Sequence, residues 1–118
     1  MKTIFFIIDK PLICDVRMQE FLDIVLMAAA FDQRVVLVFE GEGVYALMSN
    51  QQPDALGLKD NTLLFKALSI YDINDISVEK ESMQARAISV DQLLIPVITS
   101  SRYELKQRLQ LADQVFSL

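Results

Sequence analysis

Apolar residues in this chain fall into short unbroken runs, separated by segments with a helical spacing of polar and apolar positions. Residues 3–8 (TIFFII) and 35–39 (VVLVF) are runs of strand length, typical of strands buried on both faces of a parallel sheet. Between them one helical face carries five apolar residues: Met18, Leu22, Val25, Leu26 and Ala29. Asp15 is the expected N-cap of that helix. The first forty residues therefore predict a right-handed β-α-β unit.

Helical patterns also occur later in the chain. A short helix is expected over 44–48, and a longer one over 61–71 that Asp60 would cap. Residues 101–104 (SRYE) fit a capping box of the form Ser-x-x-Glu at the start of a last helix. The polar stretch 49–54 (SNQQPD) is expected to be a loop.

Three further strands are predicted over residues 75–78 (DISV), 93–98 (LLIPVI) and 114–118 (QVFSL). Pro96 favours an edge position or a strand end for the second of them, because proline lacks a backbone donor. Strands that alternate with helices predict the α/β class. We expect one domain, residues 1–118, with three α/β/α layers around a mainly parallel five-stranded sheet.

The composition indicates that this domain has apolar surface to cover. Hydrophobic residues make up 53% of the 118 residues, and glycine occurs only three times. Typical soluble domains have about 45–50% even when glycine is counted. A small domain has much surface relative to its volume, so part of this excess is expected outside the core. We therefore expect the chain to form an oligomer.

The residue counts exclude several kinds of chemistry. The chain has no histidine and a single cysteine, which removes Ser-His and Cys-His pairs, most zinc sites and an internal disulfide. A net charge of −5 with scattered basic residues argues against direct nucleic-acid binding. No apolar run reaches the length of a membrane span, and no signal peptide is visible. We expect a cytoplasmic protein without membrane contact.

Cys14 is the one candidate nucleophile. It follows the first predicted strand, at the carboxyl end where open α/β sheets place their ligands. Its neighbour Asp15 would raise the pKa of the thiol, and no basic residue in sequence would stabilise the thiolate. A small apolar residue packed at a strand-helix junction is the favoured interpretation, and a sulfur-carrying Cys14 is the alternative.

Three other polar motifs have structural explanations. Gly41-Glu42-Gly43 lacks the remaining residues of a phosphate loop, so it predicts a tight turn. Asp72 and Asp75 suit turn or capping roles, and Tyr71 suits packing. Glu79 begins the segment 79–86, which predicts a short helix or turn with a solvated start. The sequence thus indicates neither a metal site nor a cofactor.

Several segments together resemble the DsrE/DsrF family, and specifically its TusC (DsrF-like) branch. They are residues 2–11 (KTIFFIIDKP), 35–48 (VVLVFEGEGVYALM) and 50–82, which includes Phe-Lys-x-Leu-x-Ile-Tyr-Asp-Ile. The similarity runs in order along nearly the whole chain, and this last stretch is its most specific part. It implies a DsrEFH-like fold.

The resemblance also implies a function. In that family, TusB, TusC and TusD chains form a dimer of heterotrimers. This heterohexamer accepts persulfide sulfur from TusA and passes it, with TusE, toward 2-thiolation of the wobble uridine in transfer RNA. Related DsrEFH complexes serve sulfur oxidation. The choice between these pathways, and the surfaces that contact each partner, are open at this point.

The carrier chains of the family place their persulfide cysteine just after the strand that follows the Tyr-Asp helix. In this sequence that position falls at Glu79, to within a couple of residues. A carboxylate cannot accept a sulfane sulfur, so the resemblance implies a non-catalytic subunit. The alternatives are a sulfurtransferase that uses a Cys14 persulfide and a DsrF-type subunit of a sulfur-oxidation complex.

Overall fold

The computed structural model of the protein describes residues 2–9, 16–31, 33–47, 73, 75–93 and 97–117, with backbone alone at 16–19, 22 and 46. The strands are β1 (Thr3–Ile8), β2 (Arg34–Phe39), β3 (Asp75–Glu79), β4 (Ile98–Ser100) and β5 (Gln114–Ser117). The helices are α1 (Val16–Ala30), α3 (Lys80–Ala85) and α4 (Arg102–Gln110), with 3-10 segments η1 (Gly41–Leu47) and η3 (Val90–Gln92).

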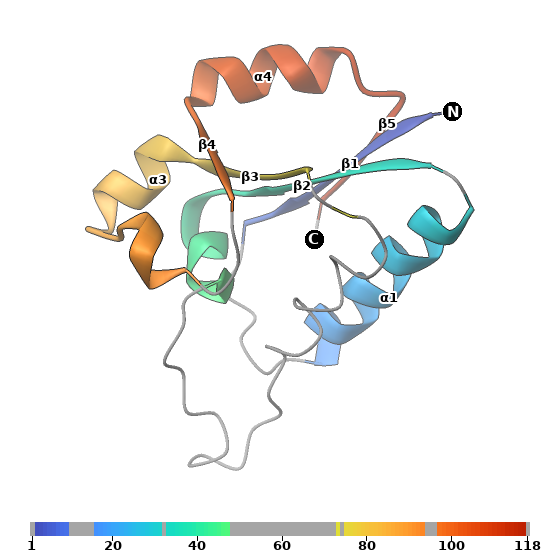
Figure 1. The fold of residues 1–118 in the computed structure, drawn as a ribbon, viewed down its shortest axis with the longest axis horizontal. Coiled ribbons are helices and arrows are strands. Elements are labelled where there is room, and N and C mark those ends of the chain that lie inside the picture. The colour runs from blue at the N-terminus through green and yellow to red at the C-terminus, as the bar shows by residue number, and fades with distance from the viewer. Residues whose placement is uncertain are drawn as a thin grey trace.

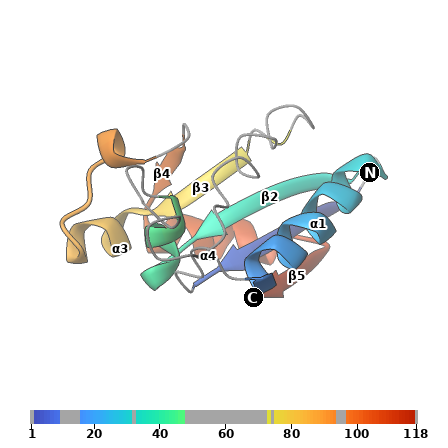
Figure 2. The ribbon, with the colours of Figure 1, turned by 90° about the horizontal axis from the view of Figure 1, so that it is seen from below.

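The five strands form one sheet in the order β4-β3-β2-β1-β5, and each pair of neighbours runs parallel. Figure 1 shows α4 over one face of the sheet and α1 with η1 over the other. Figure 2, from below, shows α1 crossing β1 and β2 in a right-handed connection. The predicted three-layer α/β/α fold is confirmed, and the sheet is wholly parallel among the described strands.

Successive side chains of the central strands point to opposite faces of the sheet. Phe6 and Leu37 point to the α1 face, where Phe21 and Val25 of α1 join the larger core cluster. Phe5, Val36 and Val38 point to the other face and pack with Leu105 of α4. Both sets are buried, which explains why these strands are apolar at consecutive positions rather than alternately.

The predicted elements mostly agree with the structure. The predicted short helix at 44–48 is the 3-10 segment η1, which starts three residues earlier. The capping box is confirmed, because the Ser101 side chain accepts a hydrogen bond from the Glu104 backbone N–H at 3.1 Å. The fourth strand is displaced, since β4 begins at Ile98, where the predicted strand was to end.

Some expectations fall on parts of the chain that the structure does not describe. They are the Asp15 and Asp60 caps, the loop over 49–54, the helix over 61–71, and Pro96. Within the described residues, no helix is long and apolar enough to cross a membrane. Large apolar side chains are exposed on several elements, as the composition predicted: Ile24, Met27, Phe31, Val90, Ile98, Tyr103, Leu111, Val115 and Phe116.

Candidate functional site: a buried carboxylate at the carboxyl edge of the sheet

The carboxyl ends of the strands open onto a cleft of about 470 Å³ between η1, α3 and α4. Asp9 follows β1, Glu40 follows β2, and Glu79 is the last residue of β3. Three bases line the same cleft: Arg86, which follows α3, and Arg102 and Lys106 of α4. In open α/β sheets this is the edge at which ligands bind, so these side chains form the candidate functional site.

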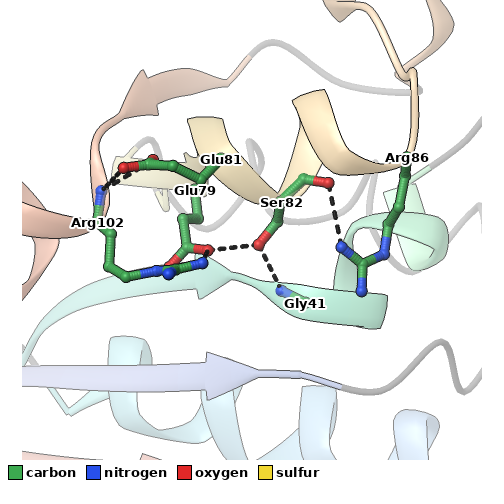
Figure 3. Close-up of polar contacts among 6 residues, drawn as sticks. All are labelled: Gly41, Glu79, Glu81, Ser82, Arg86 and Arg102. Carbon is green, nitrogen blue, oxygen red and sulfur yellow. Dashed lines mark hydrogen bonds and ion pairs between the residues drawn. The ribbon is translucent and has the colours of Figure 1, made fainter.

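Glu79 is the buried centre of this site, with 4% of its surface exposed. Arg102 donates from Nε to Oε2 at 3.2 Å and from Nη2 to Oε1 at 2.9 Å (Figure 3). This two-point hydrogen bond lowers the pKa of Glu79 below its ordinary value of 4.5, against the opposing effect of burial. Glu79 is therefore held as a carboxylate.

Ser82 connects Glu79 to the turn after β2. Its hydroxyl donates to Glu79 Oε1 at 2.5 Å and accepts from the Gly41 backbone N–H at 2.8 Å. The Ser82 carbonyl in turn accepts from Arg86 Nη1 at 3.2 Å. Ser82 is buried. If its hydroxyl were removed, Glu79 and the Gly41 N–H would each lose a hydrogen-bond partner that water could not readily replace.

Arg102 is held at its backbone as well as at its side chain. Its N–H lies 3.0 and 3.1 Å from the two carboxylate oxygens of Glu81. The Arg102 side chain is 58% exposed while it contacts Glu79. Glu79 and Glu81, near the start of α3, thus hold Arg102, the first residue of α4, through its side chain and its backbone. Figure 3 shows both contacts.

Glu40 shares the cleft but has the opposite electrostatic environment. Burial raises its pKa, and the charges of Glu79 and Asp9 raise it further, while Arg102 lowers it. Glu79 and Glu40 therefore differ: the environment stabilises the charged form of Glu79 and disfavours that of Glu40.

The turn that carries Glu40 is pressed against the end of β1. Gly41 has a φ of +55°, which favours glycine. A Cβ on Gly43 would lie 1.9 Å from the Ile8 carbonyl oxygen, so only glycine fits there. This close approach places the Gly41 N–H where Ser82 can bind it.

The known proteins similar to this chain identify its family. The DsrE/DsrF-like family matches residues 2–118. A protein named TusC homolog from Aliivibrio fischeri is 34% identical over 97 residues, 82% of each chain. The chain belongs to the DsrE/DsrF-like family. The intracellular sulfur oxidation protein DsrF of Allochromatium vinosum is 36% identical over 75 residues, which cover 64% of this chain and 55% of that protein.

Solved structures support the fold of this family member. The ychN protein from E. coli superposes with a TM-score of 0.81 over the whole of both chains, at 18% identity. A protein of unknown function from Methanobacterium thermoautotrophicum gives a TM-score of 0.71, at 17% identity, also over the whole of both chains. At these identities the similarity concerns the fold alone.

The structure corrects one interpretation of the sequence at this site. Residue 79 was expected at a solvated helix start, yet Glu79 and Ser82 are both buried. The reason is a contact distant in sequence, because α4 begins beside α3 and brings Arg102 onto Glu79. The capping-box pattern located the start of α4 but gave no sign that Arg102 would face an acid.

The other residues singled out in the sequence are not among the described residues that line the cleft. Cys14, Tyr71 and Asp72 lie outside the described residues. Asp75 lies at the amino end of β3, where its Oδ2 is 2.8 Å from Arg108 Nη2 and 3.6 Å from Arg34 Nη2. These ion pairs give Asp75 a structural role rather than a role at the cleft.

The chemistry open to the described part of the cleft is limited. Its polar lining has carboxylates, guanidinium groups, the Lys106 ammonium group and one hydroxyl that is already engaged by Glu79 and Gly41. Among the described residues no cluster of three or more acids, cysteines or histidines could hold a metal ion. The central anion of the site belongs to the chain itself, and its oxygen atoms are all held by Arg102 and Ser82.

Proposed function

We propose that this protein is a non-catalytic subunit of a TusBCD-type sulfur-relay complex in the cytoplasm. In this role it assembles with TusB-like and TusD-like chains. The complex takes persulfide sulfur from a TusA-like donor and delivers it, with a TusE-like acceptor, toward 2-thiolation of transfer RNA. This chain shapes the complex while a partner chain carries the sulfur.

The main support is the ion pair of Glu79 and Arg102. The family resemblance assigns the end of β3 to the sulfur-carrying cysteine of the carrier chains, and here that place holds a buried carboxylate. A persulfide forms only on a thiol, and a carboxylate fixed by Arg102 offers no sulfur atom. TusC-named relatives at about one-third identity support the same role.

Co-expression with TusB-like and TusD-like chains tests the proposal. We expect one complex by size exclusion and native mass spectrometry. After loading with a persulfidated TusA-like donor, intact mass should show the added sulfur on the TusD-like chain and none on this chain. A Cys14→Ser variant serves as the matched control and should support the same relay rate. A chain that stays monomeric, or that gains sulfur at Cys14, contradicts the proposal.

Sulfur oxidation is the second candidate pathway, favoured by the similarity to the DsrF protein of Allochromatium vinosum. The two candidates share the assembly and differ in the acceptor. Deletion of the gene distinguishes them: loss of 2-thiouridine from transfer RNA supports the first, and a defect confined to the oxidation of stored sulfur supports the second.

A further inference from the structure

One flank of α1 carries an exposed apolar stripe. Ile24, Met27 and Phe31 are 56%, 60% and 71% exposed. Their spacing of three and four residues places them on one side of the helix. Phe21 and Val25, the neighbouring positions around the helix, face the sheet and are buried. The stripe therefore extends the core-facing surface of α1 outward into solvent.

The stripe lies on the side of α1 that faces β5. Leu26 and Ala29, on the opposite flank, are partly buried against the main core. In a right-handed β1–α1–β2 connection the helix runs antiparallel to its strands, and its right-handed winding then puts the flank of Leu26 and Ala29 on the β2 side. The stripe is left on the β1 side, toward β5 at the edge of the sheet.

A row of aromatic rings joins α1 to that edge. Phe21 packs edge-on against Phe6, and Phe6 stacks on Phe116 of β5, each with ring centroids 5.5 Å apart. Phe116 is 47% exposed beyond this stack. The stripe of α1 and the Phe116 side of the outer strand thus form one surface, which we call the α1–β5 surface: Ile24, Met27, Phe31 and Phe116.

In the described part of the chain, the edge itself lacks the usual protection against pairing. β5 is the last strand of the sheet, and all four of its residues are exposed. Val115 and Phe116 are directed to opposite faces and each is nearly half exposed. Natural edge strands are usually shielded by lysine, proline or a bulge, and the sequence Gln-Val-Phe-Ser has neither of those residues. An apolar open edge of this kind is expected to be covered by another protein chain.

We propose that the α1–β5 surface docks an unlike protein subunit, one that presents an apolar centre with lysine or arginine at its rim. The inference builds on the proposed function, because it locates a partner surface of the proposed complex. The rim residues give the charge of the partner. Glu20, Asp23 and Asp113 are exposed acids, and Lys2 is the one base among the described side chains of α1, β5 and the start of β1.

The same charges disfavour a second copy of this chain as the occupant. A twofold interface brings the same patch of both copies together, so the acidic residues around the two patches would lie close to each other and repel. The chain as a whole also carries a net charge of −5, which adds to the repulsion between copies. A partner with a basic rim would instead pair these acids and hold the contact in register.

A lysine placed within the stripe tests the proposal. Met27→Lys would bury a charge in the apolar centre, so we expect its affinity for the TusB-like and TusD-like chains to fall by about tenfold or more. Val90→Lys is the matched control, because Val90 is 50% exposed on η3, before the strand at the other edge of the sheet. Circular dichroism checks that both variants fold.

Hydrogen exchange on the unmodified chain provides a second measurement. It tests the docking surface even if Met27→Lys does not fold. Residues 114–117 should exchange more slowly in the complex than in the free chain. The native chain could join its partners while Met27→Lys keeps its affinity and residues 114–117 exchange at the same rate in the complex. In that case the α1–β5 surface is not the docking surface, and the proposed function stands. If the native chain never joins those partners, the proposed function fails and this inference fails with it. A homodimer formed through the surface also overturns it.

Discussion

Arg102 contacts Glu79 through two hydrogen bonds, of 3.2 and 2.9 Å, that join the start of α4 to the end of β3. The two residues are far apart in sequence and meet only because β4 returns the chain beside β3. Their charges compensate each other at the carboxyl edge of the sheet. The buried charge of Glu79 is consequently compensated within the chain, by a base that stays exposed at the cleft.

The first prediction concerns acid stability. The folded-state pKa of Glu79 lies below its ordinary value of 4.5, so its ionised form stabilises the fold above that pH. This contribution should be lost as the pH falls from 4.5 through the folded-state pKa. Glu79→Gln should therefore lower the urea midpoint at pH 7, and the difference from the native chain should shrink at acid pH. An equal difference at every pH would contradict this account.

Glu40 should behave in the opposite way. Its folded-state pKa is raised, so folding is favoured below its ordinary pKa of 4.5, and this advantage is lost as the pH rises through the folded-state value. Glu40→Gln removes the cost of holding this charge in the cleft and should raise the urea midpoint at pH 7. Glu42→Gln, at an exposed position of the same turn, is the control and should leave the midpoint nearly unchanged.

How far the sequence predicted this molecule depends on the range of each interaction. The runs TIFFII and VVLVF located β1 and β2 because burial on both faces leaves a local apolar signature. Ser101 and Glu104 located the start of α4 because capping is local too. The pairing of Glu79 with Arg102 has no local signature. The acid lies at a strand end, the base at a helix start, and only the strand order brings them together.

Ser82 should prove essential to the turn after β2. Ser82→Ala removes the acceptor of the Gly41 N–H and a donor to Glu79 in a buried position, which should cost about 1–3 kcal/mol in the free energy of unfolding. Ser117→Ala, at an exposed position of β5, should change it by less than about 0.5 kcal/mol. Urea unfolding of the isolated chain measures both values, and equal effects would show that the hydrogen bonds contribute little.

The two glycines of this turn should differ in their tolerance of a side chain. Gly43→Ala would place Cβ 1.9 Å from the Ile8 carbonyl oxygen, forcing β1 and η1 apart at a cost of about 1–3 kcal/mol or more. Gly41→Ala meets nothing closer than 3.7 Å and is strained only by its φ of +55°, at about 1–2 kcal/mol. Thermal unfolding should therefore show the larger loss for Gly43→Ala, and the reverse order would mean that backbone strain outweighs the clash.

A cysteine at position 79 should convert this site into a sulfur acceptor. Arg102 would lie beside the new thiol and favour its thiolate, which lowers the thiol pKa. The thiolate attacks the outer sulfur of a persulfide donor, and the donor leaves as its own thiolate. In a Cys14→Ser background, Glu79→Cys should gain one sulfur atom by intact mass. Glu81→Cys, two residues away, is the matched control and should react more slowly. If Glu81→Cys reacts as fast as Glu79→Cys, position 79 has no special environment, and the assignment of the family's cysteine position to Glu79 is wrong.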